Sequence, residues 1–598
     1  MGPDDEPWVI WRGRESEGLF MQTRDIVAAL EEMADLLELS GANPFKSRSY
    51  RNGARTLEGL SDDVRQLVQA GTLGDVPGIG KTLVEVITEL VETGECSRLD
   101  ELRDAVPAGL LDVVRIPGVG PKKAKLLFDE LGVSGVEDLE VTCQEGTVAG
   151  LKGFGAKTQA KILDGIAYRR TVAGRFLYAQ AADAVAPMWR LLESVPGVSR
   201  LQVGGSVRRR RETIKDIDFL VSVEKQKDAA GIMEAFVGAD DVVDVIAQGE
   251  TKSSIRVSSG IQMDLRVVDD ASFPYALQYF TGSKEHNTAL RGIAREKGMK
   301  LNEYGLLKVE GDEEKLVKCK DEAAIYRKLG MDYIEPELRE NMGEIDLATS
   351  KSLPDLVARA DLRGVVHVHT TFSDGHHSLE EMVDAAQSMG FEYIGITDHS
   401  QSAGYAGGLK KKDILKQHRE IDALNEKLDG FRIFKGIESD IRADGSLDYP
   451  DDVLDLFDFI IASVHSGFQL SEKEQTERVL RALEDPHTTF LAHPTGRLLL
   501  ERDAYAINME RVLECAGELG VCVEINASPL RLDLDWRLGN FARRHGVKTA
   551  VFPDAHSTDG LAYVDYGIGI ARKAGFTKEE VVNTYSVEAF EEFVGLRK

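Results

Sequence analysis

The chain has 598 residues, with 73 Lys and Arg against 101 Asp and Glu, which gives a net charge of −28. At the usual domain size, this length predicts about three to five domains. Its 42% hydrophobic and 29% charged residues are typical of a globular protein, and no apolar run reaches the roughly 18 residues of a membrane span. The five cysteines form no C-x-x-C pair, which argues against a disulfide framework or a thiolate zinc site and fits a reducing cytoplasm.

The acidic total argues against nonspecific coating of duplex DNA, but it does not exclude a local basic groove, because counterion release depends on the contacting face. Residues 1–21 are interpreted as an N-terminal extension. Apolar residues at three- and four-residue spacing between Arg24 and Leu37 then predict an amphipathic helix. It is the first of several short helices expected before residue 175.

Three glycine-rich turns recur in this helical region, each before a predicted helix that starts with lysine. Glycine lets a backbone approach a phosphate closely, and the free N–H groups at a helix start favour an anion. Ordinary turns with solvated lysines remain the alternative, but the repetition favours DNA-backbone binding. The residues concerned are Gly78, Gly80 and Lys81; Gly118, Gly120, Lys122 and Lys123; and Gly153, Gly155 and Lys157.

Residues 176–340 mix helices with strands and carry a first group of carboxylates. Asp216 and Asp218 are two apart at the start of an apolar strand, so their side chains project from one face. Asp264 heads another apolar strand that could lie alongside. Three clustered carboxylates fit a pair of Mg²⁺ ions about 3.5–4 Å apart, which support in-line phosphoryl transfer.

A glycine turn and an arginine run precede these acids. The Gly204-Gly205-Ser206 turn supplies backbone donors, and residues 208–211 supply positive charge, as a triphosphate requires. The alternative is a D-x-D pair at an ordinary strand end beside a solvated arginine face.

The linked spacing of these motifs resembles family X DNA polymerases, the group of DNA polymerase beta, from about residue 25 to 340. The resemblance implies that Asp216, Asp218 and Asp264 are catalytic and bind two Mg²⁺ or Mn²⁺ ions, with Asp264 serving the ion at the primer terminus. It implies that Gly205, Ser206, Arg209 and Arg175 bind the triphosphate, that Tyr279, Phe280 and Gly282 contact the sugar, that Asn287 reaches the base, and that Arg291 contacts the template side.

The sequence departs from the family pattern at three positions. Lys215 stands before the first aspartate, where glycine is frequent, and Lys284 stands where the animal enzyme has an acid. Val86 occupies the position of the Schiff-base lysine, and a valine cannot form an imine. We therefore do not expect a 5′-deoxyribose-phosphate lyase to act through this position, although Lys46 and Lys81 remain candidates for binding a 5′-phosphate or for replacing the Schiff-base lysine.

Eleven of the twelve histidines lie after residue 360, in a region where short apolar strands alternate with helices. Seven strands are predicted, at residues 365–369, 393–399, 433–438, 457–465, 489–493, 521–526 and 548–556. All but the sixth end at a residue able to bind a metal ion, and the strand ends of a β/α barrel converge on one rim. Histidine and carboxylate ligands without cysteine suit Zn²⁺, Mn²⁺ or Fe²⁺ and predict phosphoester hydrolysis.

The motifs at these strand ends resemble the polymerase and histidinol phosphatase (PHP) domain. The resemblance implies a site for three metal ions on a distorted seven-stranded barrel. Its ligands would be His367, His369, Asp374, His399, Glu438, His465, His493, Asp554 and His556.

Taken together, the chain resembles a bacterial or archaeal family X repair polymerase with a C-terminal PHP domain. The expected domains are a lyase-like helical domain (22–105), helix-hairpin-helix fingers (106–178), an α/β nucleotidyltransferase palm (179–275), a thumb (276–340), a linker (341–363) and the PHP barrel (364–598).

We expect a cytoplasmic, monomeric enzyme that uses dNTPs to extend 3′ ends at gapped, nicked or 3′-recessed DNA and trims 3′ ends with its PHP domain. The resemblance also implies base excision repair, abasic-site cleavage and removal of 3′ blocks.

Two other readings remain open. In one, an inactive polymerase core only binds DNA ends and the PHP site alone is active, although a pure binding module has no need of three clustered acids. In the other, the PHP site is a small-molecule phosphatase, which the attached DNA-binding repeats disfavour.

Overall fold

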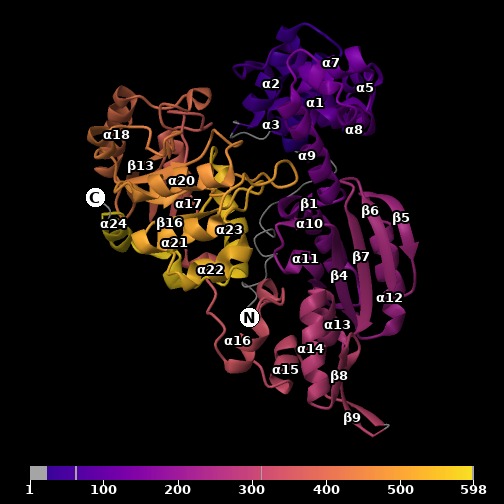
Figure 1. The fold of residues 1–598 in the computed structure, drawn as a ribbon. Coiled ribbons are helices and arrows are strands. Elements are labelled where there is room, and N and C mark those ends of the chain that lie inside the picture. The colour runs from indigo at the N-terminus through magenta and orange to yellow at the C-terminus, as the bar shows by residue number, and fades with distance from the viewer. Residues whose placement is uncertain (1–22, 59, 61–63, 312, 596–598) are drawn as a thin grey trace. The chain divides into compact units, whose positions relative to one another are not determined.

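The computed structural model describes residues 23–58, 60, 64–311 and 313–595 (Figure 1). The chain divides into two compact units: a helical unit that ends at Ala173, and an α/β unit that begins at Gly174. Among the described residues, no helix combines the length and the apolar character needed to cross a bilayer.

The helical unit is built from short helices around one apolar core. Its first helix confirms the amphipathic prediction, because Ile26, Leu30, Met33 and Leu37 are all buried. The helices are α1 (Thr23–Leu39), α2 (Pro44–Glu58), α3 (Val64–Ala70), α4 (Lys81–Thr93), α5 (Ser97–Asp104), α6 (Gly109–Val114), α7 (Pro121–Leu131), α8 (Val136–Gln144) and α9 (Ala156–Val172).

The α/β unit opens with a five-stranded sheet in the order β2-β4-β7-β6-β5. Its strands are β2 (Val198–Val203), β4 (Asp216–Val223), β5 (Val242–Gln248), β6 (Lys252–Val257) and β7 (Gln262–Asp269). Helices α10 (Tyr178–Ser194) and α12 (Ala229–Val237) share an apolar core with one face of this sheet. In β4, Ile217 and Phe219 point into that core, so Asp216 and Asp218 face the other side.

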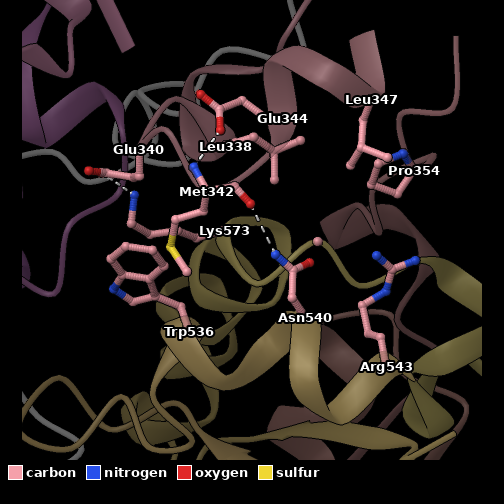
Figure 2. A pocket seen from close by; sticks show the side chains of 11 residues that line it. Leu338, Glu340, Met342, Glu344, Leu347, Pro354, Trp536, Asn540, Arg543 and Lys573 are labelled. Carbon is pink, nitrogen blue, oxygen red and sulfur yellow. Dashed lines mark hydrogen bonds and ion pairs between the residues drawn. The ribbon is translucent and has the colours of Figure 1, made fainter. Parts of the chain in front are cut away.

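A smaller subdomain follows, which we call the thumb segment (residues 273–328). It contains α13 (Phe273–Thr281), α14 (Lys284–Glu296), a three-stranded sheet of β8 (Met299–Asn302), β9 (Gly305–Glu310) and β10 (Glu313–Leu316), and α15 (Glu322–Lys328). The segment after it carries helix α16 (Glu344–Ser350). Together with Trp536, Asn540 and Lys573 it lines a small cavity of about 40 Å³ (Figure 2).

The last part of the chain forms a seven-stranded, all-parallel sheet in the sequential order β11 to β17. The strands are β11 (Gly364–Val368), β12 (Tyr393–Ile396), β13 (Arg432–Asp440), β14 (Phe459–Ser463), β15 (Thr488–Leu491), β16 (Cys522–Asn526) and β17 (Thr549–Phe552). A bridge between Val368 and Ala555 brings the two edges together and nearly closes a barrel. All seven predicted strands are therefore present.

Helices surround the barrel, as the βα alternation requires. They are α17 (Leu379–Ser388), α18 (Lys411–Asn425), α19 (Asp451–Leu454), α20 (Glu472–Glu484), α21 (Met509–Leu519), α22 (Gly539–Arg544) and α23 (Val564–Lys573). The last helix, α24 (Val587–Gly595), packs against one end of the barrel instead. Its Phe590 packs on Tyr393 (ring centroids 4.7 Å apart) and Phe434 (5.1 Å), within the cluster of strand side chains that fills the barrel. Because Tyr393 begins β12, α24 covers the barrel end opposite the carboxyl ends of the strands.

We predict that Phe590→Ala destabilises the barrel by about 3–5 kcal/mol, because it removes a fully buried aromatic side chain and leaves a cavity. Hydrogen exchange of the β12 and β13 amides measures this loss separately from the five-stranded sheet. Leu519→Ala, at a partly exposed position on α21, is the matched control and should cost less than about 1 kcal/mol. Unchanged protection in Phe590→Ala would show that α24 does not hold the barrel closed.

Candidate active sites

Three carboxylates meet on the open face of the five-stranded sheet. Strands β4 and β7 run parallel, and their register places Asp218 directly beside Asp264, with Asp216 beside Gln262. The D-x-D alternation puts Asp216 on the same face as Asp218. The structure therefore brings the three predicted acids together.

Burial and electrostatic repulsion both oppose the ionisation of Asp216 and Asp218. Burial, together with Asp216 and Asp264, raises the pKa of Asp218 to about 7, and burial and Asp264 also raise the pKa of Asp216. Lys252 Nζ lies 3.4 Å from Asp264 Oδ2. In the described part of the chain, the groups of potential metal ligands within 4.8 Å of one another all lie in the barrel, so these acids are more loosely spaced. Carboxylates such as Asp216 and Asp218, whose ionisation is opposed by burial and by neighbouring acids, are suited to divalent cations, which would favour their charged form.

The glycine turn lies against these acids. Gly205 begins the short helix α11 (Gly205–Arg208) with a φ of +60°, and a Cβ there would lie 2.4 Å from Asp218 Oδ2. Only glycine fits this position, since both the conformation and the close contact exclude a side chain. The Gly204 N–H donates to the Asp218 carbonyl at 2.7 Å. The turn and Ser206 are therefore fixed next to the carboxylate group.

The two arginines assigned to the triphosphate, Arg209 and Arg175, have different partners. Arg209 Nη1 donates to the Thr281 carbonyl at 2.6 Å, and its Nε donates to Glu340 at 3.0 Å. A Cβ at Gly282 would lie 2.9 Å from Arg209 Nη1, so this arginine lies against the glycine of the predicted sugar-contacting turn. Arg175 instead donates to Thr213, through Nε to Oγ1 (2.9 Å) and Nη2 to the carbonyl (2.6 Å). In this structure Arg175 therefore fixes a neighbouring strand.

The aromatic pair of the thumb segment is close to Asn287. The Tyr279 and Phe280 rings meet edge to face at 5.1 Å, and Asn287 Nδ2 donates to the Tyr279 carbonyl at 2.7 Å. Arg291 Nε donates to the Asn287 carbonyl at 3.3 Å, one turn along α14. The predicted sugar, base and template residues thus form one connected group.

The three glycine turns of the helical unit share one geometry. Gly78, Gly118 and Gly153 have φ between +87° and +95°, a region that other residues rarely adopt. The second glycines, Gly80, Gly120 and Gly155, are the N-caps of α4, α7 and α9, and a Cβ at any of them would meet nothing within 4 Å. The protein itself does not require glycine at these caps, which leaves space for the close approach of another molecule.

Basic side chains of α2, together with Lys122 after the second glycine turn, line a hollow. Its volume is about 460 Å³, and Arg48, Arg51, Arg55 and Lys122 line it together with Glu38. Lys81 is 93% exposed at the start of α4. Val86, by contrast, is buried in the helical core, so this position of α4 presents no side chain to solvent. The prediction about the lyase reaction stays a prediction.

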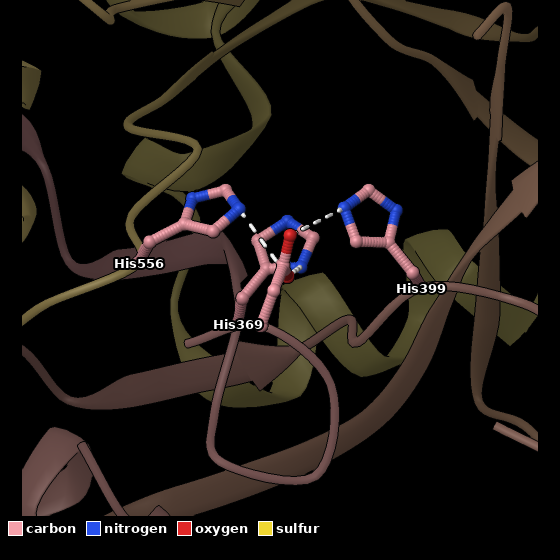
Figure 3. A group of neighbouring side chains, drawn as sticks. His369, His399 and His556 are labelled. Carbon is pink, nitrogen blue, oxygen red and sulfur yellow. Dashed lines mark ion pairs between the residues drawn. The ribbon is translucent and has the colours of Figure 1, made fainter. Parts of the chain in front are cut away.

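At the carboxyl ends of the barrel strands, all nine predicted ligands converge. They form four overlapping groups, each with ligand atoms within 4.8 Å of one another: His369, Asp374, His399 and His556; His367, His369 and Asp554; His367, Glu438 and His493; and His399, Glu438 and His465. Figure 3 shows the rings of His369, His399 and His556 directed toward one another. The His369 and His556 rings stack with centroids 4.1 Å apart.

Glu438 is the centre of this arrangement. Its carboxylate lies 2.9 Å from His399 Nδ1, 3.0 Å from His493 Nε2 and 3.2 Å from His465 Nε2. Burial opposes its ionisation, but the surrounding imidazoles hold the pKa of Glu438 well below its usual range. In turn, Glu438 and Asp440 outweigh burial and raise the pKa of His465 to about 10. Such mutual stabilisation of acids and imidazoles is the environment in which a cation can replace protons.

Two features of the backbone and side chains fit metal binding. Three ligands, His367, His493 and Asp554, have positive φ values of 64°, 24° and 53°, and β11 has a bulge at His367. Strain of this kind persists where the surrounding structure enforces it, most often at functional sites. In addition, buried nitrogens such as His367 Nε2 and both ring nitrogens of His369 make no hydrogen bond within the described chain. The donor set therefore fits a group of divalent ions.

Two acids that contact the ligands of this site, Glu524 and Asp440, were not predicted from the sequence. Glu524, on the sixth strand, is fully buried and lies 2.9 Å from His367 Nδ1, and it also accepts from the His493 backbone N–H. Asp440 lies 2.6 Å from His465 Nδ1. Both acids orient a ligand through its second nitrogen, which is the usual arrangement around metal-binding histidines. The signal in the sequence that could have identified Glu524 was a carboxylate within an otherwise apolar predicted strand.

Other residues near the rim have structural roles. Asp398, beside His399, accepts hydrogen bonds from the backbone and side chain of Thr370 and from Gln417, and joins none of the ligand groups. His377 accepts from the Thr558 N–H at 3.4 Å. His418, on the outer helix α18, packs edge-on against Phe457.

Four family models match the chain. They are a helix-hairpin-helix domain (residues 21–96), a SAM-like helix-hairpin-helix tandem (110–167), a DNA polymerase beta thumb (276–340) and a PHP domain (366–528). Each match covers a part of the molecule that carries one of the sites described above.

Curated relatives extend this picture. A Bacillus subtilis protein named DNA polymerase/3′-5′ exonuclease PolX is 37% identical over 96% of this chain and 99% of its own length. A Thermoanaerobacter protein named as a probable phosphatase is 30% identical over 37% of this chain and 90% of its own length, and rat DNA polymerase lambda is 25% identical over 57% and 61%. With a relative of this identity along nearly its whole length, the chain belongs to the bacterial PolX group of family X DNA polymerases, which joins helix-hairpin-helix, polymerase beta-like and PHP domains.

Proposed function

We propose that this protein extends 3′ ends at short DNA gaps with the carboxylates of its five-stranded sheet and trims 3′ ends with its barrel. The observation that carries the proposal is the presence of two separate clusters in one chain: three aspartates on one face of the paired strands β4 and β7, and nine candidate ligands at the barrel rim. The first cluster suits nucleotidyl transfer and the second suits phosphodiester hydrolysis. A cytoplasmic location and a monomeric state remain part of the proposal.

In the polymerase reaction, Asp216, Asp218 and Asp264 would hold two Mg²⁺ or Mn²⁺ ions, which would neutralise the triphosphate and increase the acidity of the primer hydroxyl. The Gly204-Gly205-Ser206 turn and Arg209 would bind triphosphate oxygens. The turn of Tyr279, Phe280 and Gly282 would orient the sugar, Asn287 would reach the edge of the base, and Arg291 would contact the template side. The hydrogen bonds of Asn287 to the Tyr279 carbonyl and of Arg209 to the Thr281 carbonyl would keep these groups aligned before the nucleotide binds.

In the nuclease reaction, the nine rim ligands would hold three Zn²⁺, Mn²⁺ or Fe²⁺ ions, which would polarise the phosphodiester and supply a nucleophilic oxygen from water. Glu524 and Asp440 would orient His367 and His465. Arg531, whose Nε lies 3.6 Å from Asp554, places positive charge beside the ligands, where a phosphate would bind. Cleavage at abasic sites and removal of 3′ blocks would use the same site.

The glycine turns and their lysines would hold the DNA backbone without reading its sequence. The empty space above each cap glycine supports this role, because a phosphate can approach the N–H groups there. The basic hollow near Lys122 would accept a further phosphate.

A small-molecule phosphatase is the second candidate for the barrel, since relatives named as probable phosphatases match this part of the chain. Offering 3′-recessed DNA and histidinol phosphate to the same preparation distinguishes the two. Turnover of histidinol phosphate alone would favour the phosphatase.

We predict that Asp218→Ala lowers primer extension about a thousandfold, because it removes about 4 kcal/mol of metal-assisted stabilisation, while 3′ trimming is kept. His369→Ala should do the reverse. The measurement is product length on gapped DNA with Mn²⁺ or Mg²⁺, with and without dNTPs. Equal extension by Asp218→Ala and the wild type would leave the polymerase half with DNA-end binding alone.

Glu524→Gln tests the orientation of the barrel ligands. Loss of the carboxylate that accepts from His367 should weaken Mn²⁺ binding about 10- to 100-fold, the usual effect of removing such a partner. Trimming should therefore fall at limiting Mn²⁺ and recover at high Mn²⁺. Glu477→Gln, on the outer helix α20, is the control. A loss that no Mn²⁺ concentration restores would argue against this role.

The double variant Lys122→Ala/Lys157→Ala should bind gapped DNA more weakly at every sequence. The slope of log affinity against log salt should fall by about 2, one for each lost phosphate contact. Fluorescence anisotropy across a salt series measures both. Lys412→Ala, an 81% exposed lysine of the barrel region, should change neither, and an unchanged slope in the double variant would exclude these lysines from the DNA contact.

A further inference from the structure

Within the α/β unit, a buried ionic cluster joins the barrel to the arginine that we assign to the triphosphate. Lys573 ends helix α23, and its side chain is completely buried. Its ammonium donates to Glu340 Oε1 at 2.5 Å and to the backbone carbonyls of Arg209 (3.0 Å) and Glu337 (3.1 Å). Figure 2 shows this lysine directed at Glu340 above the ring of Trp536, and the ammonium lies 4.4 Å from the ring centroid.

Glu340 is shared among three cations. Arg209 Nε donates to the same Oε1 atom at 3.0 Å, and Arg211 Nη1 donates to Oε2 at 3.3 Å. The side chains of Glu340 and Arg209 are only 9% and 12% exposed. Water therefore screens these charges weakly, and each cation alters how strongly the carboxylate holds the other two.

We propose that Lys573 of the barrel is a positioning residue of the polymerase reaction, which holds Glu340 and the Arg209 backbone so that the Arg209 guanidinium can bind the dNTP triphosphate. The inference rests on the proposed function of Arg209. Without the ammonium, Glu340 would be shared by the two arginines alone and would hold Arg209 more tightly. The pocket would also lose one positive charge near a highly anionic ligand. Nucleotide binding thus depends on a residue of the nuclease domain.

The inference also predicts the direction in which the KM for dNTP changes with pH. Burial lowers the pKa of Lys573 to about 8; Glu340 opposes this shift, and Arg209 and Arg211 reinforce it. Among the charged groups around this cluster, Glu337 pairs with Arg572 at 2.7 Å. Glu212 pairs with Arg211 at 3.6 Å and with Arg537 at 2.8 Å, beside the same Trp536 ring. A lysine loses its charge as the pH rises through its pKa. The KM for dNTP should therefore rise between pH 7 and pH 9 in the wild type.

The test is steady-state extension of gapped DNA by the full chain, with KM for dNTP and kcat measured separately. Lys573→Met should raise KM at pH 7 at least about five-fold, which is the lower end of the usual range for coupling between two sites. Its kcat should change less than about two-fold. Its KM should also no longer vary between pH 7 and pH 9. Trimming by the barrel, which uses none of these residues, should stay at the wild-type rate and shows that the domain is folded. Lys548→Met, at an exposed lysine elsewhere in the barrel region, should leave KM unchanged.

A double-variant cycle tests the route through Glu340. If Lys573 acts through this carboxylate, Lys573→Met should have little further effect in the Glu340→Gln background. An unchanged KM in Lys573→Met, or an equal rise with and without Glu340, would overturn the inference. The wild-type pH profile needs no substitution, and a KM that stays flat from pH 7 to pH 9 would also overturn it. Absence of any extension by the wild type would overturn the proposed function instead, and the inference with it.

Discussion

The cost of keeping carboxylates ionised away from water is the constraint on which both candidate sites depend. On the five-stranded sheet, Asp216, Asp218 and Asp264 share one face, and burial together with the charges of Asp216 and Asp264 raises the pKa of Asp218. At the barrel rim, the same type of problem is solved by imidazoles, which surround Glu438 and keep it ionised. The two solutions suit different chemistry. A loosely spaced acidic group can accept ions together with a nucleotide, whereas a tight group of histidines and acids can retain ions between turnovers.

Much of both sites could be predicted from the sequence because strand geometry is local. Alternation along β4 places Asp216 and Asp218 on one face, and a parallel neighbour then aligns Asp264. In the same way, a ligand at the end of each barrel strand must reach one rim, which is why all nine predicted ligands meet. The family resemblance was needed to assign roles, since the residues alone left an ordinary strand end as an alternative.

The rest depends on contacts between distant segments, which spacing does not reveal. Glu524 meets His367 across the barrel, and its role follows only from that contact. Arg175 was assigned to the triphosphate, yet its hydrogen bonds go to Thr213, because the short strands β1 (Phe176–Leu177) and β3 (Thr213–Ile214) pair beside it. The contact between Lys573 and Glu340 links residues that are 233 positions apart. No periodic pattern marks either partner.

Helix α24 has a consequence for how the enzyme matures during translation. Its Phe590 completes the apolar interior of the barrel, but it is synthesised long after the strands that carry Asp216, Asp218 and Asp264. Domains generally fold in the order in which they leave the ribosome. The strands that carry the three aspartates can therefore pair before α24 is made, whereas the barrel becomes stable only when α24 has been added. Because we infer that nucleotide binding depends on Lys573 of the barrel, full polymerase activity also waits for this region, and the two activities mature together.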